Sequence, residues 1–338
     1  MPTQTPKTKV TIRTVADDAG VSVAAVSKVL RDAYGVSDAL RAKVLKSIET
    51  LGYRPNMAAR GMRGKTRTVG ILLVEMANPF LSDVIAGIDA TLRALNYKTM
   101  IGVGEAEEQL ETSLIERMVD FQMDGLILIS PHLGSAPMAQ AAGEIPMVVI
   151  GHHEPVSQVY DTVNSDDRES AQMAVNALIA RGHRDIMMTS LQHTRLSDHD
   201  VVLEREAGYT YAMVNAGLEQ YSRIIRLPDR TAQMEADMLT LLRAPDRPTA
   251  FYCWSDLHAV PMINLAKTSG IRVPADLAII GCDDSPPARM HLIDLTSINQ
   301  DAPRLGEIAA RTLLSRIEGR KSPEHILVAP NLVIRSSI

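Results

Sequence analysis

The sequence predicts an α/β protein in two parts: an N-terminal head of three helices, and a larger two-lobed body built on doubly wound parallel sheets. Two observations predict this fold class. The first 52 residues consist of helix-length segments with capping residues, whereas from Thr68 apolar runs of strand length alternate with amphipathic helices. The length of 338 residues also exceeds what one small core usually needs.

Three short helices are expected in the head, at about 11–19, 22–30 and 37–51. Each begins with a Thr or Ser that can cap it, and apolar residues recur three and four positions apart within it. Gly20 supplies the positive-φ position of a tight turn between the first two helices. Two capped helices joined through such a turn are typical of a helix-turn-helix.

A marginal helix follows the head. Asn56 can cap it, but 57–63 make only about two turns and include Gly61, so this helix should be barely stable alone in water. Such a segment is suited to folding on a partner. We therefore divide the chain into a head at 1–52, a hinge and linker at 53–66, and a body at 67–338.

The body contains two series of strands and helices. Near-continuous apolar strands between helices predict parallel sheets covered on both faces, and such sheets bind ligands at the carboxyl ends of their strands. The last helix, 303–317, and two late strands are expected to return to the lobes. The other strands are expected at 68–74, 98–103, 125–129, 146–150, 185–189, 223–227, 250–253 and 277–281.

Charge is distributed unevenly along the chain, although the net charge is only −5. Residues 1–67 contain 13 Lys and Arg against 5 Asp and Glu, which gives +8, and the remainder carries −13. A basic head on an acidic body is expected when one end meets phosphate. The alternative is an ordinary solvated basic face.

Composition argues against several classes of protein. No apolar run approaches the ~18 residues of a membrane span, and no apolar stretch follows Lys7 and Lys9, so neither an anchor nor a secretory signal is expected. A cytoplasmic protein is therefore expected. Cys253 and Cys282 both lie in apolar runs, which favours buried, reduced core residues over a disulfide or a metal pair.

A family resemblance rests on two runs in the head and hinge, TIRTVADDAGVSVAAVSKVL at 11–30 and VSDALRAKVLKSIETLGYRPNMAARGMR at 36–63. They strongly resemble the lactose-repressor family of bacterial transcription regulators, and VGILLVEMANPF, ARGHRDI and IRVPADLAIIGCDD extend the resemblance through the body. It implies a repressor, rather than an activator, that binds palindromic operator DNA as a homodimer. It also implies an effector between lobes like those of periplasmic binding proteins: a sugar, sugar acid or sugar phosphate, with purine-type effectors also known.

The resemblance places the helix at 23–30 in the major groove. Lys28 can donate to guanine, while Val23 and Ala24 can make only apolar contacts, for example with a thymine methyl. The alternative is that Val23 and Ala24 are only helix filler. The head positions expected to contact DNA are Thr11, Ser22, Val23, Ala24, Ser27 and Lys28.

The hinge is expected to enter the minor groove. Met62 stands where the family has a wedging Leu, and methionine is apolar enough to unstack a base step. Arg60 and Arg63 would hold phosphates. The alternative for Met62 is a lost wedge that packs against its dimer mate. The matching hinge positions are Asn56, Ala59, Arg60, Met62 and Arg63.

The effector cleft is the third expected site. Arg205 can form a fork on two hydroxyls or a carboxylate, Asp283 can accept two hydroxyls, and Phe80 offers a ring face. The alternatives are a lobe-stabilising salt bridge for Arg205 and Asp283, and simple core packing for Trp254. The lining positions implied by the resemblance are Pro79, Phe80, Arg205, Trp254, Asp256 and Asp283.

Two rival classes fit the sequence less well. A sugar-binding transport component needs a signal peptide and has no use for a basic head. An enzyme needs a nucleophile, base or metal set, and the sequence shows neither a Walker loop nor a GxSxG elbow. Glu107 stands where a dinucleotide fingerprint needs glycine, and the adjacent His152 and His153 lack zinc-type spacing. No cofactor or metal is therefore expected.

Overall fold

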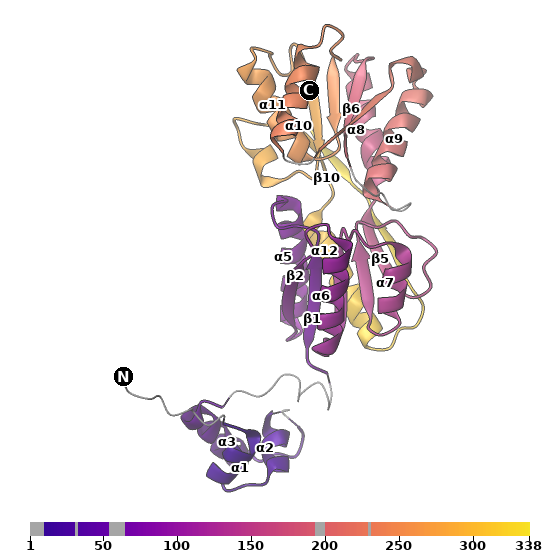
Figure 1. The fold of residues 1–338 in the computed structure, drawn as a ribbon. Helices are drawn as coiled ribbons and strands as arrows, with labels where there is room; N and C mark the ends of the chain where they lie inside the picture. Colours follow the sequence, from indigo (N-terminus) through magenta and orange to yellow (C-terminus); the bar gives the residue numbers. More distant parts are fainter. Residues whose placement is uncertain (1–9, 31–32, 54–64, 193–199, 229–230) are drawn as a thin grey trace. The chain divides into compact units, whose positions relative to one another are not determined.

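The computed structural model describes residues 10–30, 33–53, 65–192, 200–228 and 231–338. The chain divides into two compact units, Met1–Thr66 and Arg67–Ile338. Both units are drawn in Figure 1.

The head contains three helices, α1 (Ile12–Asp18), α2 (Val23–Leu30) and α3 (Asp38–Leu51). Hydroxyl side chains begin all three. Thr11 forms a reciprocal capping box at α1, and the Ser22 and Ser37 hydroxyl oxygens accept backbone N–H groups at 3.1 and 3.3 Å. Gly20 and Gly52 take φ of 59° and 60°, the left-handed conformation that ends α1 and α3. The expected head helices are thus present at the expected positions.

A small apolar core holds the head together. Val26 and Val29 of α2 face this core, while residues between them face outward. The Ser47 hydroxyl of α3 donates to the Asp18 carboxylate at 2.6 Å and ties α3 to the end of α1. The buried members of the core are Val15, Ala16, Ala19, Val26, Val29 and Val44.

The body contains two six-stranded sheets. The first has the order β11-β5-β4-β3-β1-β2 and is parallel throughout. Its strands are β1 (Thr68–Leu73), β2 (Lys98–Val103), β3 (Gly125–Ile129), β4 (Met147–Ile150), β5 (Asp161–Ser165) and β11 (His325–Val328). The second has the order β12-β10-β9-β8-β6-β7, and only β12 runs antiparallel to its neighbour. Its strands are β6 (Ile186–Leu191), β7 (Arg223–Leu227), β8 (Ala250–Cys253), β9 (Ala278–Cys282), β10 (Thr296–Asn299) and β12 (Asn331–Val333).

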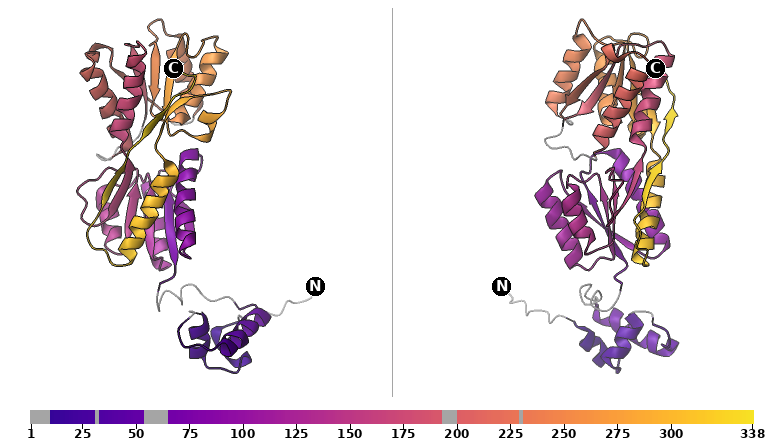
Figure 2. Two further views of the ribbon diagram at one scale, coloured as in Figure 1. Left: turned by 180° about the vertical axis from the view of Figure 1, so that it is seen from behind. Right: turned by 90° about the vertical axis from the view of Figure 1, so that its right-hand side faces the viewer.

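Helices cover both faces of each sheet, as Figures 1 and 2 show. In the first lobe α5 and α12 pack together on one face, and α6 and α7 cover the other. In the second lobe α8 and α9 share one face, and α10 and α11 the other. Their bounds are α5 (Pro79–Ala94), α6 (Glu108–Asp120), α7 (Ser135–Ala142), α8 (Asp167–Ala180), α9 (Val201–Asn215), α10 (Ala232–Arg243), α11 (Asp256–Thr268) and α12 (Ala302–Ile317).

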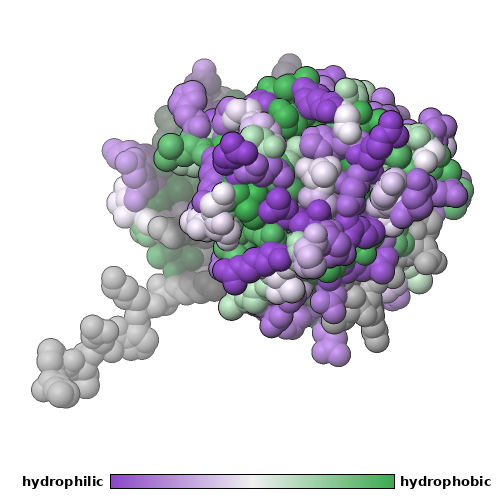
Figure 3. Space-filling view, turned by 90° about the horizontal axis from the view of Figure 1, so that it is seen from above, coloured by the Kyte–Doolittle hydropathy of each residue, from purple (hydrophilic) through white to green (hydrophobic). Residues whose placement is uncertain are grey.

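The chain passes between the lobes at three places: from β5 into α8, from β10 into α12, and from β11 into β12. The carboxyl ends of parallel strands in both lobes therefore face the space between them, which is where ligands of such sheets bind. Figure 3 looks onto one end of the body, where hydrophilic side chains cover most of the surface and smaller hydrophobic areas lie between them.

The structure adds two strands that the pattern of apolar runs did not predict, β5 and β10. Their sequences, DTVNS and TSIN, are polar, yet they are almost wholly buried because each lies inside a sheet. Specific partners satisfy these polar groups. Asp161, for example, accepts hydrogen bonds from the guanidinium groups of Arg316 and Arg320 at 3.0 and 2.9 Å. Most other boundaries differ from expectation by one or two residues.

Both cysteines lie in the second lobe, where they are buried and form no disulfide. Burial raises the pKa of the Cys253 thiol to about 12, so this side chain packs as a small apolar group.

Candidate functional site

The outward face of α2 carries the residues expected to read DNA. Ser22, Val23, Ala24 and Lys28 are exposed, and Ser27 is half-buried. An exposed fraction of 37% for Val23 is notable, because the other two valines of α2 are buried in the core. Thr11 is also exposed, at the start of α1. The expected hinge contacts Asn56, Ala59, Arg60, Met62 and Arg63 lie outside the described residues.

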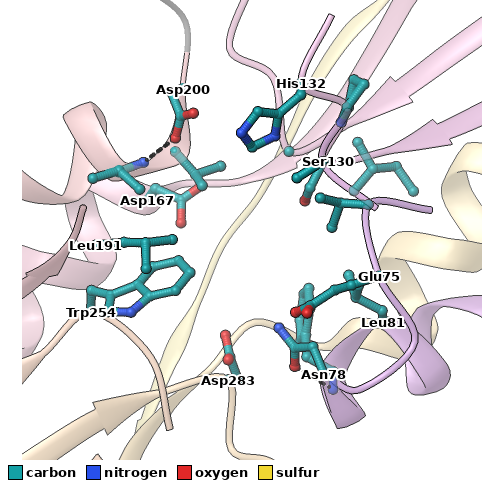
Figure 4. A pocket seen from close by; sticks show the side chains of 18 of the residues that line it. Glu75, Asn78, Leu81, Ser130, His132, Asp167, Leu191, Asp200, Trp254 and Asp283 are labelled. Carbon is teal, nitrogen blue, oxygen red and sulfur yellow. Dashed lines mark hydrogen bonds between the residues drawn. The ribbon is translucent and has the colours of Figure 1, made fainter. Parts of the chain in front are cut away.

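A cavity of about 740 Å³ lies between the two lobes of the body. Segments that follow the strands β1, β3, β6, β8 and β9 line it, as expected for parallel sheets. Figure 4 shows the close view, in which Glu75, Ser130 and His132 come from the first lobe and Trp254 and Asp283 from the second. Of the six lining residues expected from the sequence, Phe80, Arg205, Trp254 and Asp283 line this cavity.

Arg205 of α9 is 4% exposed and carries a buried ion pair. Its Nε donates to Oδ1 of Asp167 at 2.7 Å, and its Nη1 donates to the carbonyl oxygen of Trp254 at 2.5 Å. The guanidinium carbon lies 5.6 Å from the centre of the Trp254 ring. The cation is thus held by the protein itself, with Asp167 rather than Asp283 as its ion-pair partner.

Asp167 also binds the first lobe. Its Oδ2 lies 2.8 Å from Nε2 of His153, which follows β4, while Asp167 itself begins α8 of the second lobe. Burial by itself would raise the pKa of Asp167, but the Arg205 and His153 partners outweigh it and lower that pKa. Burial would likewise lower the pKa of His153, and the Asp167 carboxylate outweighs it and raises that pKa.

Asp283 follows β9 and has a strained backbone, with φ of 116° in the region that favours glycine. The amide of Gln300 donates to its Oδ1 at 2.6 Å. Burial raises the pKa of Asp283 well above the usual range, against the opposing charge of Arg205. Strain held at a cavity wall is common where a side chain must be aimed at a ligand.

Asp256 and Pro79 lie apart from the large cavity and border a neighbouring cavity of about 240 Å³. The Asp256 carboxylate is enclosed by hydrogen bonds from the Ser285 N–H, the Ser285 hydroxyl and the Ser297 hydroxyl, at 2.7, 2.8 and 2.7 Å. It therefore fixes the loop that carries Asp283. Burial also raises the pKa of Asp256.

Two buried polar atoms at the cavity wall have no hydrogen-bond partner among the described residues. They are Nε1 of Trp254 and Oγ of Ser165. Unpaired buried donors and acceptors are costly, so a ligand that satisfies them gains affinity. His258 packs edge-on against Trp254 with ring centres 5.9 Å apart, and burial lowers its pKa to about 3, so it is neutral.

Glu111 positions the loop that brings His132 to the cavity. This carboxylate of α6 is fully buried and accepts the backbone N–H groups of His132 at 2.9 Å and Leu133 at 3.1 Å. Burial raises the pKa of Glu111, and the two backbone donors oppose that shift.

In the part of the chain that the structure describes, no group of three or more His, Cys, Asp or Glu is arranged to hold a metal ion. None of the described helices is long and apolar enough to cross a membrane.

Two family models match the chain. Residues 11–56 match that of bacterial regulatory proteins of the lacI family, and residues 175–338 match a periplasmic binding protein-like domain. Catabolite control protein A of Priestia megaterium is 30% identical, over 96% of this chain and 97% of the relative. The HTH-type transcriptional repressor PurR of Erwinia tasmaniensis is 31% identical, over 97% of this chain and 96% of the relative. The chain belongs to the lacI family.

Solved structures extend the likeness of this lacI-family chain. A complex of the transcriptional regulator CelR with cellobiose is 29% identical, with a TM-score of 0.70, and covers 97% of this chain and 100% of that chain. The Lac repressor bound to ONPG has a TM-score of 0.83 at 24% identity, with 98% of this chain and all of that chain covered, and shows the fold alone. The expected fold class and family are confirmed. This lacI-family protein is a transcription repressor and not an enzyme.

Several cleft residues escaped the sequence analysis. Ser165 ends β5 and Asp167 follows it closely, and this strand is too polar to be recognised from the sequence. The partner of His153 is Asp167, so this ion pair could not be recognised either. Glu75, His132 and the other lining residues follow apolar strands. Their position at a strand end was a usable signal, because parallel sheets bind ligands there.

Proposed function

We propose that this lacI-family repressor binds palindromic operator DNA as a homodimer in the cytoplasm, and that a small polyhydroxylated molecule in the cleft controls its affinity. One observation carries the proposal: a single chain joins a helix-turn-helix head, whose second helix turns Lys28 and Val23 outward, to a body with a 740 Å³ cavity between its lobes. DNA binding and ligand binding thus belong to two units of one polypeptide.

The head reads the major groove through α2. Lys28 donates to a guanine edge, Val23 and Ala24 contact thymine methyls, and Ser22 and Ser27 donate to phosphates. Thr11 lies at the start of α1 as a further phosphate contact. In the hinge, Met62 wedges into a minor-groove step and Arg60 and Arg63 hold phosphates, with Asn56 and Ala59 on the same helix.

Pairing of two chains is supported by an exposed apolar strip at the edge of the first sheet. Met100 and Ile101 of β2 are 45% and 44% exposed, and Leu95 just before β2 is 49% exposed. β2 is the outermost strand of its sheet, so its outer edge has no neighbouring strand among the described residues. A two-fold interface across this edge covers the strip and presents two heads to two half-sites.

The cleft takes the effector. Phe80 and Trp254 offer ring faces, Asp283 accepts hydroxyl groups, and the solved CelR complex holds cellobiose. Asp256 supports this site by holding the Asp283 loop through Ser285, and Pro79 lines the neighbouring cavity beside it.

Selection of bound duplexes from a randomised DNA library by the full-length protein tests the DNA-binding part. We expect a palindromic consensus to be enriched. Lys28→Ala should relax the preference at one position in each half-site and cost about 1–3 kcal/mol per contact.

Lys46→Ala is the matched control, since Lys46 is an exposed lysine of α3. It removes the same charge from the same head without touching α2, so the consensus should survive. A library that yields no palindrome, or two variants with the same altered consensus, would contradict the proposal.

A further inference from the structure

The charges that line the cleft constrain the effector further than its shape does. Arg205 is the one Lys or Arg among the described residues at the cavity wall. Five acidic side chains share that wall: Glu75, Glu105, Asp167, Asp200 and Asp283. Burial raises the pKa of Asp283, so this residue adds least to the negative charge. The described wall therefore carries more acidic groups than basic ones. Whether it can bind an anion depends first on whether the Arg205 guanidinium is free to do so.

Arg205 is not available to a ligand anion. Its charge is compensated by Asp167 at 2.7 Å, and both side chains are at most 4% exposed. A ligand carboxylate or phosphate would have to displace Asp167 or share Arg205 with it. Displacement would leave Asp167 buried with only His153 as a charged partner, and separating a buried ion pair is strongly unfavourable.

Helix N-termini are the other common binding places for anions, and the chain's own side chains cap two of those at the cavity wall, α9 and α5. Asp200 caps α9 and accepts the Val202 N–H at 2.8 Å. Asn78 caps α5 and accepts the Phe80 N–H at 3.0 Å. An anionic ligand at either terminus would compete with the capping side chain for the backbone N–H groups at the positive end of the helix dipole. At α9 it would also be repelled by the Asp200 carboxylate.

The remaining groups of the wall suit hydroxyls. Trp254 Nε1 and Ser165 Oγ are buried and have no hydrogen-bond partner within the described part of the chain, and each can bond a ligand hydroxyl. Carboxylates accept hydroxyl hydrogens, and Gln192 and Gln300 add uncharged donors and acceptors. Such a wall suits uncharged ligands and distinguishes them by the pattern of their hydroxyl groups.

We propose that the cleft binds an uncharged polyhydroxylated effector and rejects sugar acids and sugar phosphates. This inference rests on the proposed effector function of the cleft. It excludes two of the three classes of sugar ligand that the family resemblance allows.

The electrostatic potential in the cleft can be measured without any effector, because Trp254 is the only tryptophan of the chain and is half-buried at the cavity wall. Fluorescence quenching of the full-length protein by Cs⁺ and by iodide is compared at constant ionic strength, with N-acetyltryptophanamide as the reference. We expect the ratio of the Cs⁺ to the iodide quenching constant to exceed that of the reference by roughly twofold or more. A ratio at or below the reference overturns the proposal.

Asp200→Asn and Glu75→Gln should each move the quenching ratio back toward the reference. Asparagine also caps helices well, so Asp200→Asn keeps the start of α9. Glu116→Gln is the matched control, because Glu116 is an exposed residue of α6 away from the cavity wall, and it should leave the ratio unchanged. Equal changes of the quenching ratio in all three variants would show that the carboxylates of the cleft do not set the potential at Trp254, which would contradict the proposal.

A thermal-shift panel tests the consequence for binding. Each sugar is offered with its amino, acid and phosphate forms, and we expect every anionic form to bind at least roughly tenfold more weakly than its uncharged parent. An anionic form that binds more tightly than its parent overturns the inference. If no sugar binds while Cs⁺ is the better quencher, the proposed effector class is wrong and the acidic field of the cleft still stands.

Discussion

Asp167 receives one cation from each lobe of the body. Arg205 approaches from α9 at 2.7 Å and His153 from the segment after β4 at 2.8 Å. The first contact lies within the second lobe, whereas the second crosses the cleft. A buried carboxylate needs such partners, because ionised groups out of water are costly when unpaired. His153 is the titratable member of this cluster near neutral pH.

The His153–Asp167 contact predicts how stability depends on pH. The pKa of His153 is raised above the ordinary 6.5, so folding favours its protonated form. The resulting stabilisation is fully present below 6.5 and is lost as pH rises through the higher folded value. We expect the difference in Tm between the native protein and His153→Gln to be largest near about pH 5.5 and to shrink toward about pH 9.

Leu292→Gln is the control, since Leu292 is 84% exposed and carries no titratable group, so its loss should change Tm equally at every pH. A Tm difference for His153→Gln that grows with pH would contradict the assigned ion pair. Differential scanning fluorimetry over a pH series is sufficient.

Sequence reasoning reached residues whose chemistry is visible without a partner. Arg205 and Asp283 were placed at the cavity by family resemblance, and both lie there. Asp167 was not found, because its position at the cleft depends on β5, a polar strand that the sequence pattern does not predict. Asp256 was expected at the effector, yet two serines enclose its carboxylate, a set of contacts that no spacing in the sequence reveals.

At the scale of elements, α5 and α12 approach each other more closely than side chains would allow. An added methyl group on Gly306 would lie 2.1 Å from the Val84 carbonyl oxygen, and one on Gly87 would lie 2.1 Å from the Pro303 carbonyl oxygen. Backbone atoms cannot move aside as the end of a side chain can. The contact between these two helices, which covers one face of the first sheet, therefore requires glycine at both positions.

Gly306→Ala should lower the free energy of unfolding by about 1–3 kcal/mol, despite the better helix propensity of alanine. Chemical denaturation of the full-length protein measures this. Gln140→Ala is the control, because Gln140 is an exposed residue of α7 and alanine suits a helix at least as well, so the change should stay within about 0.5 kcal/mol. Equal stabilities for the two variants would show that α5 and α12 can separate without cost.

Elements with strong local signals could be predicted from the sequence, and those without could not. The bounds of α2 and α3 match expectation because a capping serine begins each helix and apolar periodicity runs through it. β5 and β10 lack apolar alternation. Hydrogen bonds and ion pairs from neighbouring elements stabilise their polar side chains instead. Their polar groups become acceptable only inside the sheet, so no local rule marks them as strands.

At the scale of the whole molecule, the three passages between the lobes make the body one ligand-sensitive unit. A ligand that contacts both lobes stabilises their closed arrangement by its difference in affinity for the two states. The segment at 54–64 joins this body to the head in sequence. In a dimer, closure of two bodies would alter the distance between two hinges, and operator binding would respond to the effector through that distance.

The central claim is that two chains act together on one palindromic operator. It is tested most directly by titrating the full-length protein onto a selected palindromic duplex, and onto the same duplex with one half-site scrambled, while sedimentation gives the stoichiometry. We predict two chains per intact duplex and an affinity lower by roughly a hundredfold or more when one half-site is lost. One chain per duplex, with equal affinity for both DNAs, would contradict the claim.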